Sequence, residues 1–302
     1  MRSSLRHGRR GSRRQCRRSS KDEASWSGDR RETSARRRYG GSSVWRVVRA
    51  SVAFTALRLQ RRTFARTGGG VMFQQTHDAL WIAEGQIVSF FGAPYPTRSA
   101  IVRLENGDLW VWSPVKLTAD LVAEVNRLGP VRHLVSPNKL HHLYLPEWKV
   151  AFPGAQLWGP RSTIKKCSDL SFREALTDNP PPEWLPDIDQ AWFRGSFAMD
   201  EIVFLHRPSA TVIIADLMQT FSDHFLREHW GFWRVFARLD GLTKDQARAP
   251  LEWRLSFINR EPARRARDKM LGWNCRQVIV AHGECLPSNA STQLVKSFSW
   301  LG

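Results

Sequence analysis

The sequence lacks the patterns that define several common classes of protein. Its four cysteines, Cys16, Cys167, Cys275 and Cys285, form no CxxC pair, so neither a zinc ribbon nor a disulfide scaffold is indicated. A reduced compartment is the simpler expectation for such a chain. No run of about 18 apolar residues occurs, and we therefore expect no transmembrane helix.

Acidic residues are scarce in the first part of the chain. Residues 1–70 contain 20 Lys or Arg residues but only 4 Asp or Glu residues, so they carry nearly all of the formal net charge of +18. Residues 71–302 hold the remaining 26 basic and 24 acidic residues and are close to neutral. This balance argues against a nucleic acid as the partner of the folded part, because a nucleic-acid groove needs an excess of basic side chains.

Residues 1–70 are rich in Arg and Ser, and we expect this leader to be disordered or to act as a transit peptide. Residues 43–64 are basic, lack acids and can form an amphipathic helix, which is typical of organelle transit peptides. If the leader is a transit peptide, we expect the protein in the chloroplast rather than the mitochondrion, and otherwise in the cytoplasm. Alternatively, the leader is an extension without a role or an arm that binds nucleic acid.

Residues 71–302 alternate strand-like and helix-like segments and are expected to form one domain. An Asn-Gly step between two apolar runs, 99–104 and 109–112, predicts a hairpin. Further strands are expected at 131–135, 156–158, 191–194, 201–205, 211–215 and 277–281, and helices at 118–128, from residue 162, at 251–271 and at 288–300. Strands mixed with helices along the whole chain predict layered sheets covered by helices, as in a four-layer αββα sandwich of the α/β class.

Candidate metal ligands follow three of these strands directly. His141 and His142 come after the strand at 131–135, Asp216 after the strand at 211–215, and His282 after the strand at 277–281. Imidazole nitrogen and carboxylate oxygen are ligands that zinc, iron and manganese take from proteins. Each residue also has a structural interpretation: a solvent-facing His pair, a helix N-cap for Asp216, and a loop hydrogen bond for His282.

Several segments of the sequence resemble the metallo-β-lactamase (metallo-hydrolase) superfamily. They are more similar to a plant, algal and bacterial domain family of unknown function that shares this fold. The segments are GDLWVWSP at 107–114, HLVSPNKLHHLYLPEW at 133–148, LWGP at 157–160, EIVFLHRPSATVIIADL at 201–217 and VIVAHGE at 278–284. The resemblance implies a metallo-β-lactamase-like αββα domain over residues 71–302.

The resemblance also shows where the chain departs from the superfamily's metal motif, HxHxDH. When the motif ends on His142, Pro137 and Lys139 fall at its first two His positions and His141 falls at its Asp position. Ser196 falls near the next His ligand, whereas Asp216 and His282 match the bridging Asp and the final His. The resemblance therefore implies a degenerate site in which one of two metal pockets is lost.

The retained residues define the predicted site. His141, His142, Asp216 and His282 are the expected ligands of one divalent ion (Zn, Fe or Mn), although a site without metal remains the alternative. Asp216 and His142 are the expected catalytic residues. Lys139, whose ammonium group could fill the vacated pocket, His206 and Trp148 are candidate binding residues, with core packing the alternative for Trp148.

Two functions follow from this set of residues. The first is a metallo-hydrolase that uses one metal ion to hydrolyse an ester, thioester or phosphoester. The second is a non-catalytic domain of the same fold. It would bind a small molecule or a protein partner in the cleft that holds the metal site in the superfamily. A nuclease is a weaker third interpretation, which rests on the basic side chains between Arg254 and Arg267.

Overall fold

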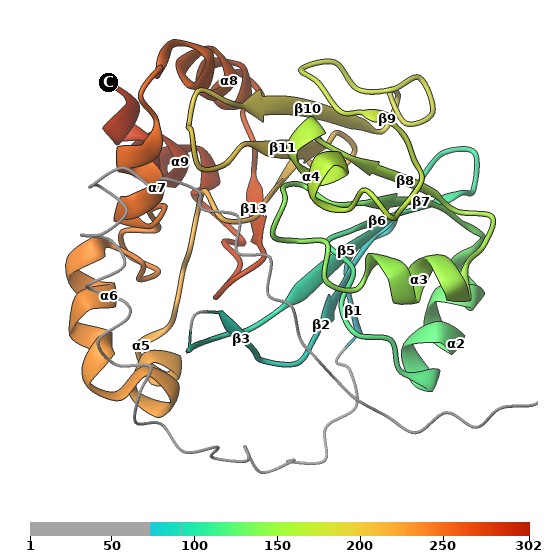
Figure 1. Ribbon diagram of the computed structural model, residues 1–302, viewed down its shortest axis with the longest axis horizontal. Coiled ribbons are helices and arrows are strands. Elements are labelled where there is room, and N and C mark those ends of the chain that lie inside the picture. Colours follow the sequence, from blue (N-terminus) through green and yellow to red (C-terminus); the bar gives the residue numbers. More distant parts are fainter. Residues whose placement is uncertain (1–72, 91) are drawn as a thin grey trace, which may run out of the picture. The chain divides into compact units, whose positions relative to one another are not determined.

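Two β-sheets lie face to face at the centre of the computed structural model, which describes residues 73–90 and 92–302 (Figure 1). The predicted leader, residues 1–70, lies outside the described residues. No helix in the described ranges is both long enough and apolar enough to cross a bilayer.

The larger sheet has seven strands in the order β1-β2-β5-β6-β7-β8-β9. Strands β5 and β6 pair antiparallel, and this pair is the hairpin predicted around the Asn-Gly step. From β6 to β9 the neighbours are parallel, so the carboxyl ends of β6, β7 and β8 meet at one edge of the sheet. Its strands are β1 (Phe73–His77), β2 (Leu80–Glu84), β5 (Arg98–Arg103), β6 (Leu109–Trp112), β7 (Val131–Val135), β8 (Gln156–Gly159) and β9 (Phe172–Ala175).

The smaller sheet has four strands in the order β10-β11-β12-β13. Its last two strands are parallel, and their carboxyl ends also meet at one edge. A separate two-stranded hairpin pairs β3 (Val88–Phe90) with β4 (Ala93–Tyr95). The strands of the smaller sheet are β10 (Ile188–Phe193), β11 (Glu201–His206), β12 (Thr211–Ile214) and β13 (Gln277–Val280).

Alternating apolar side chains explain why the two sheets stack. In β6, Trp110 and Trp112 point into the cluster between the sheets, whereas Leu109 and Val111 point to the outer side. Strand β11 does the same, with Phe204 in the cluster between the sheets and Val203 outside. Because both faces of each sheet are apolar, each sheet needs a second covering layer.

Helices supply that covering layer on both outer faces. Helices α2 and α3 pack on the larger sheet, and α8 and α9 pack on the smaller sheet, which confirms the predicted αββα sandwich. Side chains of the short helices from α5 to α6 pack in a cluster with Tyr95 of β4. The bounds are α2 (Ala119–Leu128), α3 (Leu145–Ala151), α4 (Arg161–Lys166), α5 (Asp223–Phe225), η1 (Leu226–Trp230), η2 (Gly231–Trp233), α6 (Arg234–Asp240), α7 (Leu251–Ser256), α8 (Glu261–Gly272), α9 (Ala290–Ser297) and η3 (Ser299–Leu301).

The prediction of a single helix over 251–271 is wrong. The chain forms two helices there, α7 and α8, separated by Phe257–Arg260. Phe257 leaves the helical region with ψ of 84°, and Pro262 lies in the first turn of α8, where its missing N–H costs no hydrogen bond. Strands β1, β2, β4 and β9 were not predicted, because their segments lack a clear alternation of apolar and polar residues.

Candidate metal centre

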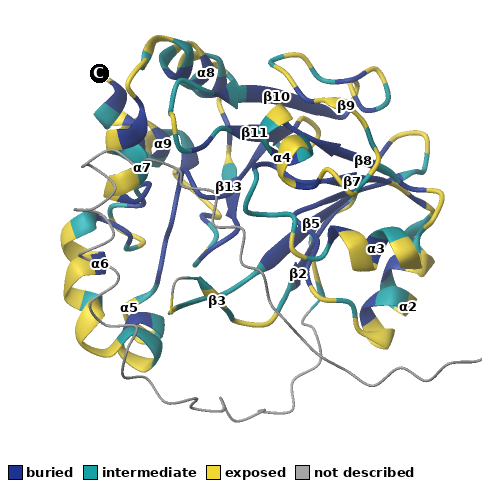
Figure 2. Ribbon diagram, in the orientation of Figure 1, coloured by how far each residue is buried: buried dark blue, intermediate teal, exposed yellow. Residues whose placement is uncertain are grey.

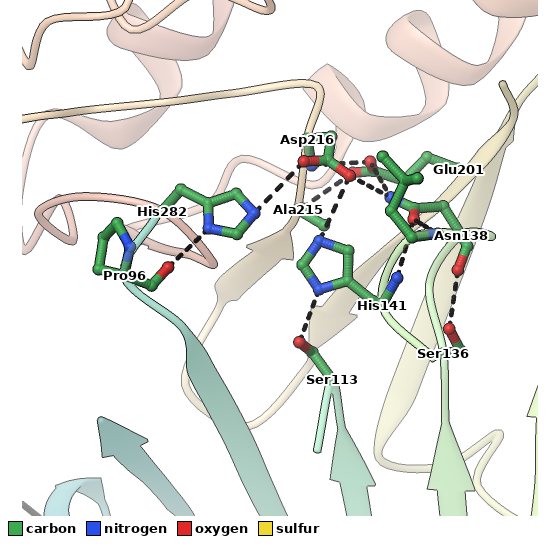
Figure 3. Close-up of polar contacts among 10 residues, drawn as sticks. Pro96, Ser113, Ser136, Asn138, His141, Glu201, Ala215, Asp216 and His282 are labelled. Carbon is green, nitrogen blue, oxygen red and sulfur yellow. Dashed lines mark hydrogen bonds and ion pairs between the residues drawn. The ribbon is translucent and has the colours of Figure 1, made fainter. Parts of the chain in front are cut away.

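Three ligand-type side chains converge at the edge where the carboxyl ends of both sheets meet. They are His141 after β7, Asp216 after β12 and His282 after β13 (Figure 3). One ligand atom from each lies within 4.8 Å of the other two. The fold therefore brings together residues that are up to 141 positions apart in the chain.

His141 is held by a turn and by a neighbouring strand. The Asn138 side-chain oxygen accepts hydrogen bonds from the backbone N–H of Leu140 (2.7 Å) and of His141 (3.3 Å), which closes the turn after β7. Ser113, which follows β6, hydrogen-bonds the His141 Nδ1 through its hydroxyl at 2.7 Å. The remaining ring nitrogen, Nε2, lies 3.3 Å from the Asp216 Oδ2.

His282 is oriented in the same way by a backbone carbonyl. Its Nδ1 lies 2.8 Å from the carbonyl oxygen of Pro96, and a carbonyl only accepts, so Nδ1 is the donor. The Nε2 of His282 then lies 3.3 Å from the Asp216 Oδ1. Tyr95 packs against the imidazole edge-on, with ring centroids 5.1 Å apart.

Asp216 is buried and is held by hydrogen bonds on several sides. The Asn138 amide donates to its Oδ2 at 2.8 Å, and the Asp216 backbone N–H donates to Glu201 at 2.8 Å. Burial alone would raise the pKa of Asp216, but the charges and hydrogen bonds of His141 and His282 lower that pKa overall. The side chain is therefore an ionised carboxylate between two imidazoles.

Glu201 and Asn138 are parts of the centre that the sequence did not reveal. Glu201 is fully buried at the start of β11, accepts the backbone N–H groups of Ala215 and Asp216, and accepts from the Asn138 amide at 2.9 Å. Burial and the Asp216 charge raise the pKa of Glu201 to about 8, while the hydrogen bonds that it accepts work in the opposite direction. The signal available in the sequence was a single acid at the start of an otherwise apolar strand.

The donor set of the centre suits one divalent cation. The Nδ1–H of His282 is used by Pro96, so the Nε2 that faces Asp216 is the ring nitrogen left to coordinate a cation. The Nε2 atoms of both histidines lie 3.3 Å from an oxygen of the same carboxylate, so one cation can be bound by all three side chains. Two imidazoles and one carboxylate, each imidazole held by a second partner, form the ligand arrangement of catalytic zinc sites.

A pocket of about 90 Å³ opens onto this centre. Much of its wall is apolar, and its lining contains no Lys or Arg. The pocket is lined by Val88, Phe90, Tyr95, Thr97, Ser113, Pro114, Leu140, His141, Leu143, Tyr144, Asp216, Gln219, Glu252, Trp253 and His282.

The other predicted site residues lie outside the His141–Asp216–His282 group. His142 is half-buried, and burial lowers its pKa, but it is neither in the group nor in the pocket lining. Lys139 is half-buried and forms no ion pair with the described acids. His206 is buried at the far end of β11 from Glu201, where its Nδ1 bonds the Ser209 hydroxyl at 2.7 Å.

Trp148 also lies away from the pocket. It is fully buried in the cluster between α3 and the larger sheet, and its indole N–H donates to the carbonyl of Val115 at 2.6 Å. Its ring is used for packing between layers, so the structure favours the core alternative over a ligand wall for this residue.

Several solved metallo-β-lactamases are similar in structure to this chain. One from Pontibacter korlensis has a TM-score of 0.53 at 14% identity and covers 77% of this chain and 99% of its own. One from Hirschia baltica has a TM-score of 0.51 at 14% identity and covers 75% of this chain and 96% of its own. The chain has a metallo-β-lactamase-like fold.

A sequence comparison relates part of this metallo-β-lactamase-like domain to a family whose function is not assigned. Residues 77–225 match the family described as "Domain of unknown function (DUF4336)". No curated protein matches the chain significantly. Another structural neighbour, from Pseudomonas aeruginosa, is a metallo-β-lactamase in its mono-zinc form, with a TM-score of 0.50 at 12% identity, covering 76% of this chain and 94% of its own.

Proposed function

We propose that this protein is a hydrolase that uses one divalent metal ion held by His141, Asp216 and His282. The observation that carries the proposal is that both imidazole Nε2 atoms face the same ionised carboxylate while each Nδ1 is bonded elsewhere. A divalent ion bound there supplies Lewis-acid activation of water for hydrolysis. A structural neighbour in a mono-zinc form supports one ion as compatible with the fold.

The protein's own residues would orient the ligands and shape the substrate site. Ser113 and Pro96 fix the ring planes of His141 and His282, and Asn138 holds the Asp216 carboxylate. Partners of this kind keep metal ligands in place before the ion binds. Asp216, the only ionised acid of the group, balances one of the two charges of the cation.

The pocket favours an uncharged acyl group as the part of the substrate that enters it. Its lining offers no Lys or Arg to a phosphoryl group, which argues for an ester or thioester over a phosphoester. Val88, Leu140 and Trp253 provide an apolar wall. A volume of about 90 Å³ suits a short acyl chain more than a large one.

Metal content tests this proposal directly. Elemental mass spectrometry on the full chain should find about one equivalent of Zn, Fe or Mn in the natural protein. The double variant His141→Ala/His282→Ala should lose the metal, and His142→Ala should keep it, because His142 is outside the group. Retention of metal by the double variant, or its loss in His142→Ala, would contradict the assigned ligands.

Activity is the second half of the test. The metal-loaded protein should hydrolyse short-chain esters or thioesters faster than phosphoesters, and the double variant should not. Metal binding without hydrolysis of any of the three would favour the second function, a non-catalytic binding domain. The sequence keeps that function open, because Pro137 and Lys139 stand where the superfamily motif has His.

A further inference from the structure

The pocket beside the metal centre has an acid in its wall that no basic side chain balances. Glu252 lies in the first turn of α7, a helix with several exposed residues, and lines the pocket (Figure 2). It forms no ion pair with a Lys, Arg or His in the part of the chain that the structure describes. Arg254 of the same helix is held instead by the carboxylate of Asp240 and, at 3.0 Å, by the Asp240 carbonyl. The charge of Glu252 is therefore left to the pocket.

The rest of the pocket lining adds negative rather than positive potential. It contains no Lys or Arg. Gln219, which is 1% exposed, has a buried Oε1 atom without a hydrogen-bond partner among the described residues, so the partial negative charge of this oxygen is uncompensated. The charge of Asp216 is not counted here, because it faces the imidazoles of His141 and His282. A pocket with this balance favours a ligand group that carries positive charge.

Aromatic rings beside Glu252 indicate which kind of cation the pocket suits. Trp253 is half-buried and lines the pocket, as do Tyr95 and Tyr144. The faces of Trp and Tyr rings attract organic cations such as ammonium groups, and the attraction strengthens where water is excluded. The oxygen atoms of Glu252 and Gln219 are too few to hold a hard metal cation such as calcium, which takes six to eight oxygen ligands. The combination of one carboxylate with aromatic rings therefore suits an ammonium group.

We propose that Glu252 and Trp253 bind a protonated amine carried by the alcohol or thiol part of the substrate. This inference rests on the proposed hydrolase function and names its substrate class, the short-chain esters or thioesters of amino alcohols or amino thiols. Hydrolysis of such an ester adds water across the acyl C–O bond and releases a carboxylic acid and an amino alcohol. The uncharged acyl group and the amine lie on opposite sides of the bond that breaks, so one substrate can satisfy both preferences of the pocket.

Binding of the amine is measured first, with probes that cannot be hydrolysed. N,N-dimethylethanolamine, which is protonated at neutral pH, is compared with 3-methylbutan-1-ol, an uncharged alcohol of the same shape, by ligand-observed NMR on the full chain. The test variant is Glu252→Gln. The matched control is Glu147→Gln, which removes an exposed acid from the first turn of α3, outside the pocket lining.

We expect the natural protein and the control to bind the amine about tenfold more tightly than the alcohol, and Glu252→Gln to lose most of this preference. About 1 M salt, where the Debye length is about 3 Å, should weaken the preference in the natural protein. Equal affinity of the natural protein for the two probes, or an unchanged preference in Glu252→Gln, would overturn the proposal.

Hydrolysis then separates this inference from the function on which it rests. The two substrates are 2-(dimethylamino)ethyl acetate and 3-methylbutyl acetate, which differ in the same way as the two probes. The ratio of their kcat/KM values should fall in Glu252→Gln but not in Glu147→Gln, and comparing this ratio between proteins cancels the intrinsic reactivity of each ester. Hydrolysis of both esters with one ratio in all three proteins would overturn the amine site but support the hydrolase. A binding preference for the amine without hydrolysis of either ester would overturn the hydrolase but support the amine site.

Discussion

The Nδ1 of His282 donates to the carbonyl oxygen of Pro96 at 2.8 Å, and this bond joins the edges of the two sheets. Pro96 precedes β5 of the larger sheet, and His282 follows β13 of the smaller one. The bond leaves the Nε2 of His282 facing Asp216 at 3.3 Å. A contact between the sheets thus sets the ring nitrogen that is available to a cation.

Asn138 should control the affinity for metal. Its amide donates to Asp216 and Glu201 while its oxygen holds the turn that carries His141, so Asn138→Ala loosens two ligands at once. We expect metal affinity to fall about 10- to 100-fold, measured by zinc competition with a chromogenic chelator. The control is Asn179→Ala, an exposed residue outside the centre. Unchanged affinity in Asn138→Ala would contradict this role.

Ser113 should affect the metal site more than the stability of the fold. It adopts a left-handed backbone with φ of +48°, a conformation that is costly for Ser and that directs its hydroxyl at the His141 Nδ1. Ser113→Ala should lower metal affinity about tenfold. Ser99→Ala is the matched control, because Ser99 is equally buried and makes a 2.7 Å bond to the Trp112 carbonyl but touches no ligand. Similar affinities in the two variants would rule out an orienting role for Ser113.

Gly283 should tolerate no side chain. It has φ of +108°, and a Cβ there would lie 2.3 Å from the Thr220 backbone. Gly283→Ala should lower the free energy of unfolding by at least about 2 kcal/mol in urea titrations, and should also displace His282. Gly107→Ala, with φ of +86° and no atom near the new Cβ, should cost only about 1 kcal/mol of conformational strain. Equal losses in the two variants would show that the close approach at Gly283 can relax.

His206 should make the protein less stable in mild acid. Burial, together with the nearby His77, lowers the pKa of His206 from 6.5 to about 4. Above pH 6.5 the side chain is neutral in both folded and unfolded states. Between pH 6.5 and about 4 the unfolded state binds the extra proton, so the folded state loses stability as the pH falls, by up to about 3 kcal/mol.

The measurement for His206 is the free energy of unfolding against pH. The His206→Gln variant should show a smaller loss than the natural protein between pH 6.5 and 4, whereas His224→Gln, at an exposed position, should follow the natural protein. Parallel curves for the natural protein and His206→Gln would contradict the assigned cause. Because other groups titrate in the same pH range, the contribution of His206 is the difference between the curves of the natural protein and of His206→Gln.

The sequence alone determined the layer arrangement and the edge at which the chemistry gathers. Runs such as 131–135, 211–215 and 277–281 are short, apolar and followed at once by His or Asp, and these are local properties. Carboxyl ends of parallel strands meet at one edge of a sheet, so the local pattern is enough to group Asp216 with His282, whereas the His141–His142 pair follows a strand of the other sheet. The resemblance to metallo-hydrolases then supplied the αββα fold.

Only the tertiary structure decided which of the adjacent histidines joins the group and what holds it. His141 and His142 are equivalent as sequence, but the Asn138 turn directs His141 toward Asp216 and leaves His142 outside. Glu201 lies 63 positions after Asn138 in the sequence, so no local sequence pattern predicts the hydrogen bond between them. Such contacts depend on how separate elements meet, and the periodicity of one element carries no information about its neighbours.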